Sequence, residues 1–298
     1  MDPNFLGTGP LNAQYFMKSG SFVWEKPYNC QFIYIIAAGA GGAGGGGQVA
    51  GIMCGGGGGG RGRLRIGVVP GIFAPHVFHI QIGVGGVGGS GDGADGSATG
   101  LFLSHCGNNF TSTTVLSDVA FIAVPGATGA KSGANGGGVG EPNTVCAFPT
   151  STTPIIYMGI VSEFDMYYNS SALASWGTSE TSANDVKAAM TSGGGGGGPG
   201  DTTTYGGGSI ISTCVPLTLY GGNKVSAGSL PDIPSWSMSE IPLFCGGPGG
   251  GGSVGGPGQN GSPGGPGCGG GGGAGAGAGQ TAGLGGNGGD GFVIIYTW

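Results

Sequence analysis

Glycine occupies every third position from Gly246 to Gly273, and this period constrains the fold more than any other feature of the chain. The prolines of the same stretch all stand at the third residue of the triplet: Pro248, Pro257, Pro263 and Pro266. A period of three built from glycine and proline is typical of the left-handed polyproline-II helix, which has three residues per turn and rises about 3.1 Å per residue. One side of such a helix carries only glycine, so a neighbouring helix can approach it closely.

A helix of this kind has no internal hydrogen bonds, so its N–H groups must donate to neighbouring segments. Proline has no N–H to donate, and its phase is expected to point away from the bundle. We therefore predict a polyglycine-II bundle whose packed face consists of scaffold glycines: Gly246, Gly249, Gly252, Gly255, Gly258, Gly261, Gly264 and Gly267.

Two other structures share parts of this pattern. Collagen also requires glycine at every third position, but here the remaining positions are mostly glycine as well, which collagen does not need. The runs Gly55–Gly60 and Gly193–Gly198 suit helices that have neighbours on several sides. A flexible glycine linker is the other alternative.

Composition bears on the choice between order and disorder. The 79 glycines and 18 prolines make up about a third of the 298 residues, a fraction that is common in disordered chains. Disordered chains are usually also highly charged and poor in aromatics, whereas here only 7% of the residues are charged and 9% are aromatic. Ordering so many glycines costs about 40–80 kcal/mol more than ordering alanines. Dense backbone hydrogen bonding is therefore required.

Four short stretches read as strands: Phe32–Ala38, Arg61–Val69, His76–Ile82 and Gly291–Trp298. We expect them to pair into one small sheet, and we expect Phe32–Ala38 to lie in the same sheet as the last strand. No long window has a convincing 3.6-residue period. The predicted fold class is mostly irregular and β, a polyglycine-II helix bundle with a small β-sheet near the chain ends and almost no α-helix.

The predicted organisation is an N-terminal attachment arm, residues 1–18, followed by one glycine-rich domain, residues 19–298. Three stretches interrupt the glycine pattern and are predicted to be loop insertions: 101–125, 141–192 and 201–245. The first residues lack the basic start and long apolar run of a secretory signal peptide, so we do not expect one. No apolar stretch approaches the ~20 residues of a membrane-spanning helix.

Residues that could support catalysis or bind metal are sparse. His76 and His79 are expected on opposite faces of a strand, which prevents both from binding one metal ion. His105 and Cys106 are adjacent but have no acidic partner nearby in the sequence. There is no phosphate-binding GxxxxGK[ST] motif. We therefore predict no enzyme, no catalytic residue, no cofactor and no metal.

Three further features have competing interpretations. The sequence GGNGGDGFV fits a calcium-binding nonapeptide, but it occurs once, and the simpler interpretation is that Asp290 ends a glycine helix before a strand. Arg61, Arg63 and Arg65 are expected on one strand face, either solvated or docked on an acidic partner. The seven cysteines have no CxxC spacing and are interpreted as free thiols, with one or two disulfides as the alternative. With eight Lys plus Arg and a net charge of −6, no nucleic-acid partner is expected.

The chain resembles a family at residues 18–100 and 246–298. Five elements carry this resemblance in order: SGSFVW-x-x-P, FIYIIAAGAGGAGGGG, GGGGGGRGRLRIGVVPG, HVFHIQIGVGGVGGSG and a closing GGNGGDGFVIIYTW. Together they are similar to the glycine-rich domain of phage tail proteins and of tail-fibre-tip adhesins.

The resemblance implies a sandwich of polyglycine-II helices whose loops contact a receptor on the host surface, either a glycan or an outer-membrane protein. It implies a virion protein that is made in the host cytoplasm, and a homo-oligomer such as a trimer is compatible with that role. We expect the arm to attach the chain to other virion proteins, because it precedes the folded pattern and mixes apolar residues with turn formers. Aromatic rings in the insertions are the expected receptor-binding residues: Tyr167, Tyr168, Trp176, Tyr205, Tyr220 and Trp236. The alternatives are a purely structural virion component, such as a capsid decoration or short head fibre, and an ice-binding bundle, which lacks the expected threonine ladder.

Overall fold

The computed structural model describes the chain in several segments, and its described part consists of β-strands and irregular backbone without any α-helix. This confirms the prediction of a mostly irregular and β chain at that level. The described residues are 12–49, 55–103, 120–132, 160–162, 184–186, 210–212, 217–219, 246–247, 249–252 and 256–298.

The first of the sheets has five antiparallel strands in the order β1-β12-β3-β4-β8. Its strands are β1 (Asn12–Phe16), β3 (Phe32–Ala38), β4 (Leu64–Pro70), β8 (Ile160–Ser162) and β12 (Phe292–Thr297). As predicted, β3 and β12 pair with each other, with Phe292 opposite Ala38 and Thr297 opposite Ile33. The last strand is thereby paired with a strand from the first part of the sequence, inside one sheet.

Both faces of β3 are covered, which explains why its sequence is continuously apolar instead of alternating. Ile33 and Ile35 belong to the larger hydrophobic cluster. Ile36 and Ala38 point the other way, into a second cluster with Phe292.

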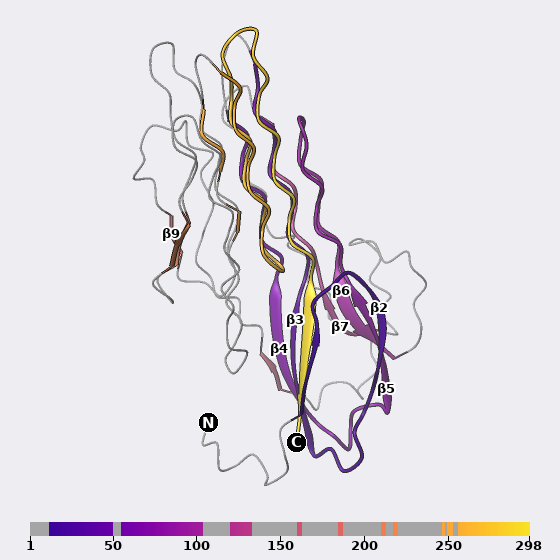
Figure 1. The fold of residues 1–298 in the computed structure, drawn as a ribbon. Helices are drawn as coiled ribbons and strands as arrows, with labels where there is room; N and C mark the ends of the chain where they lie inside the picture. The colour runs from indigo at the N-terminus through magenta and orange to yellow at the C-terminus, as the bar shows by residue number, and fades with distance from the viewer. Residues whose placement is uncertain are drawn as a thin grey trace.

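The prediction that His76–Ile82 joins the same sheet is wrong. This stretch forms β5 (Val77–Ile82) in a separate antiparallel sheet of order β2-β5-β6-β7, with β2 (Gly20–Glu25), β6 (Thr99–Phe102) and β7 (Ala120–Val124). Alternate residues of β5, Phe78 and Ile80, are buried in the same hydrophobic cluster as Ile33 and Ile35 of β3. The connection after β4 leads the chain into this second sheet, which lies beside the first (Figure 1), and apolar side chains of the two sheets belong to one cluster.

The predicted boundary of the arm also differs from the structure. Asn12–Phe16 is an edge strand of the five-stranded sheet, with Asn12 opposite Thr297 and Phe16 opposite Val293. Phe16 packs against the larger cluster, which gives this segment a place in the domain. Residues 1–11 lie outside the described residues.

The predicted insertions contain additional short strands. Residues 101–125 include the end of β6 and all of β7. Strand β8 lies within 141–192 and extends the five-stranded sheet. A three-stranded sheet of order β11-β10-β9 comprises β9 (Asn184–Val186), β10 (Ile210–Ser212) and β11 (Leu217–Leu219).

Glycine-rich segments continue from the two sheets in extended, wavy paths that run side by side and turn back at their far ends (Figure 1). An isolated parallel bridge joins Val49 to Ala276. We call this region the glycine lattice, its end next to the strands the sheet end, and its opposite end the turn end. The lattice comprises the described residues of 39–47, 55–63, 83–97, 125–132, 246–252 and 256–291.

Candidate functional site

Segment 39–47 lies at the centre of the glycine lattice, and its donors rotate among three neighbours. Residues 39, 42 and 45 donate to segment 57–63, residues 40, 43 and 46 to segment 91–97, and residues 41, 44 and 47 to segment 283–289. The N···O distances are 2.8 to 3.1 Å. Successive N–H groups therefore point in three directions around the axis, and the pattern repeats every three residues.

The carbonyl groups of the same segment accept bonds from three further segments. Ala127 and Ala130 donate to Ala40 and Ala43, while Gly270 and Gly273 donate to Gly42 and Gly45, and Gly86 donates to Gly41. Segment 39–47 is thus hydrogen-bonded to neighbours on all sides. Backbone groups that would otherwise be buried without partners are satisfied in this way.

Close packing leaves no space for side chains at most glycines of this segment. A Cβ at Gly41 would lie 1.9 Å from the Cys268 carbonyl oxygen, and one at Gly42 would lie 2.0 Å from the Thr128 oxygen. At the turn end, by contrast, a Cβ at Gly89 would meet nothing within 4 Å. The requirement for glycine therefore belongs to the interior of the lattice and not to every glycine of the chain.

Seven of the eight predicted scaffold glycines lie in the described part of the lattice, and Gly255 lies outside it. Four of them donate to every third carbonyl of a parallel segment: Gly258 to Thr281, Gly261 to Leu284, Gly264 to Asn287 and Gly267 to Asp290. Gly246, Gly249 and Gly252 are buried. Pro257 and Pro263 are exposed, in the orientation that the missing N–H of proline predicts, whereas Pro266 is half-buried and Pro248 lies outside the described residues.

Side-chain oxygens at a spacing of three residues accept N–H groups at the edges of the lattice. Asp92 and Asp95 accept from Ser132 and Gly129, at 2.8 and 2.7 Å, and Asn287 accepts from Gly88 at 2.8 Å. The Lys131 ammonium and the Ser132 N–H, both donating to Asp92, lower the pKa of that carboxyl. Asp and Asn side chains thus act where a lattice N–H lacks a backbone acceptor. This use of acidic residues was missed from the sequence, although their spacing of three was a visible signal.

Asp290, just before β12, also accepts backbone N–H groups through its side chain. Its two carboxylate oxygens accept N–H groups from Ser19 at 3.0 Å and from Gly85 at 2.9 Å. These bonds fit the simpler interpretation of GGNGGDGFV, in which Asp290 ends a glycine segment. Within the described residues, no group of three His, Cys, Asp or Glu side chains could hold a metal ion.

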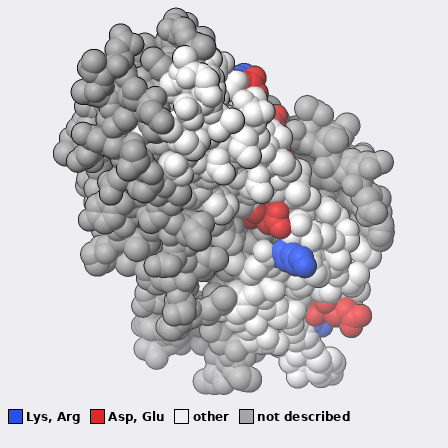
Figure 2. Space-filling view, turned by 45° about the horizontal axis from the view of Figure 1, so that its top comes forward, with Lys and Arg blue, Asp and Glu red and all other residues white. Residues whose placement is uncertain are grey.

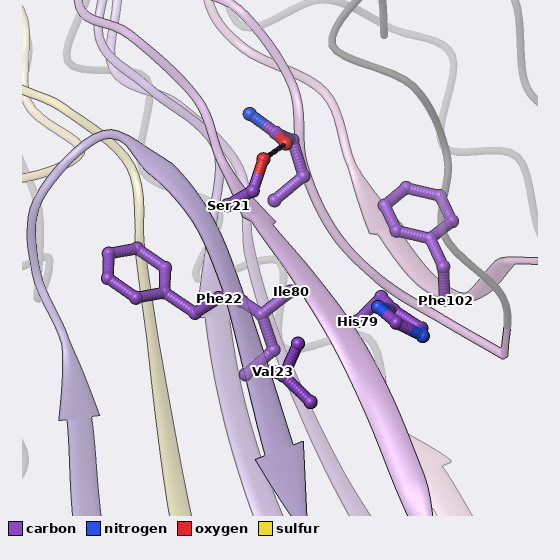
Figure 3. A pocket seen from close by; sticks show the side chains of 7 residues that line it. Ser21, Phe22, Val23, His79, Ile80 and Phe102 are labelled. Carbon is purple, nitrogen blue, oxygen red and sulfur yellow. Dashed lines mark hydrogen bonds between the residues drawn. The ribbon is translucent and has the colours of Figure 1, made fainter.

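A hollow of about 200 Å³ is lined by residues of β2, β5 and β6 (Figure 3). It is lined by Ser21, Phe22, Val23, His79, Ile80, Gln81 and Phe102. The Ser21 hydroxyl donates to the Gln81 side-chain oxygen across the two strands. His79 is half-buried beside this hollow, whereas His76 precedes the strand and is exposed.

The predicted arginine face is wrong for Arg65. Arg65 lies in β4 opposite Ala37 and is only 1% exposed, because both faces of this strand are covered where it meets the lattice. Arg61 and Arg63 come before the strand, in segment 55–63, and are partly buried. The three residues therefore do not form a solvated strand face.

Three tyrosines gather on the face of the five-stranded sheet that carries the second hydrophobic cluster. The Tyr296 ring lies 6.3 Å from Tyr15 and 6.0 Å from Tyr34 between centroids. Burial, followed by the hydrogen bond with Tyr15, raises the pKa of Tyr296 to about 12. Burial also raises the pKa of Tyr34.

The six predicted receptor-binding aromatics all lie outside the described residues, as do His105 and Cys106. Cys30 and Cys268 are free thiols, and the other cysteines lie outside the described part. Burial raises the pKa of the Cys30 thiol, against the opposing charge of Lys26.

The surface seen in Figure 2 carries few charges, which fits the low charge of the whole chain. An ion pair joins Lys131 to Asp92 at 2.9 Å near the turn end of the lattice. The described segments contain no apolar helix of the length that a membrane crossing requires.

Comparison with known protein families places the chain. No curated protein is significantly similar to the chain. The model of the glycine-rich domain family matches residues 17–298, which is nearly the whole chain and includes the glycine lattice and every described strand except β1. The chain therefore belongs to the glycine-rich domain family.

Proposed function

We propose that this chain is a phage tail-fibre or fibre-tip protein in which a polyglycine-II bundle carries the loops that bind a receptor on the host surface. The observation that carries the proposal is the rotation of donors along segment 39–47 through three neighbours, with a repeat of three residues. Three residues per turn, without internal hydrogen bonds, is the geometry of the polyproline-II class of helix. The resemblance of the sequence to tail-fibre-tip proteins points to the same arrangement.

The lattice suits a display scaffold because many interior positions have no space for a side chain. Where a Cβ would lie about 2 Å from a backbone oxygen, as at Gly41 and Gly42, no other residue fits without moving a neighbouring segment. Variation that changes binding must then occur in the connections between segments, where binding residues on rigid scaffolds commonly lie. In this proposal the connections supply Tyr167, Tyr168, Trp176, Tyr205, Tyr220 and Trp236.

A second candidate is a purely structural virion component, such as a capsid decoration or a short head fibre. The observation that favours it is the use of aromatic residues in the described part of the chain. Trp24 is 1% exposed and stacks on Phe78 at 5.4 Å between ring centroids, inside the sandwich. If the aromatic side chains of the connections are likewise buried in a core, they do not contact a receptor, and the protein is a structural component only.

An adsorption experiment with the purified full-length chain separates the two candidates. Cells of the host are incubated with the chain, washed, and then exposed to phage, and the fraction of adsorbed phage is measured. The receptor-binding proposal expects bound chain and a dose-dependent loss of adsorption. A folded chain that neither binds cells nor competes, but is present in purified particles, would favour the structural candidate instead.

A further inference from the structure

Two asparagines of the glycine lattice are each followed directly by glycine. They are Asn260, before Gly261, and Asn287, before Gly288, and both asparagines are exposed. A third such pair, Asn135–Gly136, lies outside the described residues. Asparagine is a thermolabile residue, and a following glycine carries no Cβ to hinder the approach of its backbone nitrogen to the asparagine side chain. Deamidation is therefore open to both positions unless the fold prevents it.

Deamidation begins when the backbone nitrogen of the glycine attacks the side-chain carbonyl carbon, Cγ, of the asparagine. The N–Cγ bond forms, the Cγ–Nδ2 bond breaks, and ammonia leaves with the proton that the backbone nitrogen gives up. A succinimide ring remains, and water opens it at either carbonyl to give aspartate or isoaspartate. The reaction thus has two requirements: the glycine N–H must be free, and the asparagine side chain must turn toward its own next peptide.

The lattice engages the attacking nitrogen at both positions. The Gly288 N–H donates to the Gly86 carbonyl at 2.9 Å, and the Gly261 N–H donates to the Leu284 carbonyl at 2.9 Å. Each hydrogen bond holds the proton that the nitrogen must lose when it attacks. The first requirement is therefore not met while these segments are paired.

The lattice also turns both asparagine side chains toward a neighbouring segment. The Asn287 Oδ1 accepts the Gly88 N–H at 2.8 Å, and the Asn260 Oδ1 accepts the Leu284 N–H at 2.8 Å. Closing the succinimide ring would break these bonds. In each case the segment that holds the asparagine side chain also accepts the glycine N–H, at Gly86 or at Leu284. One neighbouring segment therefore blocks both reacting groups.

We propose that Asn260 and Asn287 are deamidation sites that the folded lattice keeps closed and that react only when the neighbouring segment separates. Exposure does not open them, because what the folded chain prevents is the attack itself and not the access of water. Parts of a folded protein separate locally at a lower free energy than global unfolding requires. Deamidation at Asn287 therefore records how often segment 283–289 separates from segment 83–89.

Isoaspartate is the product that the lattice cannot accommodate. In isoaspartate the main chain runs through the side chain, so the backbone gains one atom before the next N–H. Gly261, Gly264 and Gly267 donate to every third carbonyl of one segment, so an added atom at position 260 displaces all three donors. Aspartate, by contrast, keeps the backbone and the acceptor oxygens. A chain that stays open until isoaspartate forms therefore cannot close again, which makes its unfolding irreversible.

The test compares the full-length chain when it is folded and when it is unfolded in urea, in the same mildly alkaline buffer. Samples are digested at intervals, and mass spectrometry quantifies asparagine, aspartate and isoaspartate at positions 260 and 287. Gly88→Ala is the opening variant, because its Cβ would lie 2.1 Å from the Gly285 carbonyl oxygen of the neighbouring segment. Gly89→Ala is the matched control, because a Cβ there meets nothing within 4 Å. Circular dichroism establishes which samples are folded.

We expect each site to react about tenfold or more slowly in the folded parent than in urea, because only the opened fraction is reactive. Gly88→Ala should raise the rate at Asn287 more than the rate at Asn260, and Gly89→Ala should leave both rates at the parental value. Equal rates in the folded and unfolded parent, or no conversion in urea, would overturn the proposal. This comparison of the parent decides the matter even if Gly88→Ala does not fold.

Refolding tests the consequence of the product. The parent is aged in urea and diluted, and its folded and unfolded fractions are separated and analysed. Isoaspartate at positions 260 and 287 should be strongly depleted from the folded fraction, while aspartate should occur in both fractions. The double variant Asn260→Asp and Asn287→Asp, which keeps the acceptor oxygens, should lose less of its refolding yield on ageing than the parent does. Isoaspartate in the folded fraction at its input proportion would refute the exclusion of this product from the lattice.

Discussion

Two kinds of glycine are present in the lattice, and a single added methyl group distinguishes them. At Gly42 a Cβ would lie 2.0 Å from the Thr128 oxygen, whereas Gly89 has open space in that direction. We predict that Gly42→Ala lowers the free energy of unfolding by about 3 kcal/mol or more, because neighbouring backbones must separate. Gly89→Ala is expected to be neutral or slightly stabilising. Thermal and denaturant unfolding measure both, and equal effects would show that packing does not set the glycine requirement.

The tyrosine cluster predicts a dependence of stability on alkaline pH. The pKa of Tyr296 is about 12 in the folded chain against an ordinary value of 10.0, so the folded state holds this proton more tightly than the unfolded state does. The resulting stabilisation is fully present below pH 10 and is lost as the pH rises from 10 to about 12. Tyr296→Phe should therefore flatten the decline of stability over this interval, measured by urea unfolding.

Tyr28→Phe is the matched control for that experiment, because the Tyr28 side chain is exposed and lies outside the cluster of Tyr15, Tyr34 and Tyr296. It should leave the alkaline decline as it is in the parent. A Tyr296→Phe variant whose decline is as steep as that of the parent would contradict the assignment of the effect to this phenol.

At the scale of elements, the N-terminal segment divides into two parts with different expected effects. Deleting residues 1–18 removes β1, opens the edge of β12 and uncovers the core where Phe16 packs, which should cost about 2 kcal/mol or more. Deleting residues 1–11 alone should leave the domain folded but absent from particles. Thermal unfolding and particle immunoblots measure the two effects, and a stable chain without β1 would contradict the role given to this strand.

Strand existence was predictable from the sequence, but the assignment of strands to sheets was not. The apolar runs that became β3 and β12 were identified because such runs need cover on both faces. The alternation in β5 correctly predicted a strand with one buried face. Alternation does not specify whether a strand joins the edge of a sheet or faces it, because that choice depends on distant partners such as Trp24 and Leu101.

The candidate site was predictable only to the extent that glycine spacing describes it. The period of three identified residues such as Gly258 and Gly267, whose N–H groups bond to a neighbouring segment. Which segment pairs with which could not be predicted, because glycine has no side chain to distinguish one partner from another. The burial of Arg65 was missed for a different reason, because a charged residue in an alternating strand usually faces solvent.

For the whole molecule, the proposed function predicts that recognition and stability can be separated. Replacing Trp176 and Trp236 with Ala should reduce adsorption of the chain to host cells severely, since aromatic anchors often contribute about 2 kcal/mol or more each. Thermal stability should remain nearly that of the parent. Adsorption and calorimetry are measured on the same preparation. An unfolded double variant would favour the structural candidate, and a folded variant that adsorbs normally would place recognition elsewhere.

The rotation of donors along segment 39–47 also restricts how this chain can change in length. Inserting a single residue would turn every later N–H toward a different neighbouring segment. The carbonyl groups of that segment would not lie opposite these donors, so the hydrogen bonds beyond the insertion would be lost together. Inserting three residues restores each donor to its own neighbour. The gene can therefore lengthen or shorten this part of the protein only three codons at a time, with matching changes in the segments alongside.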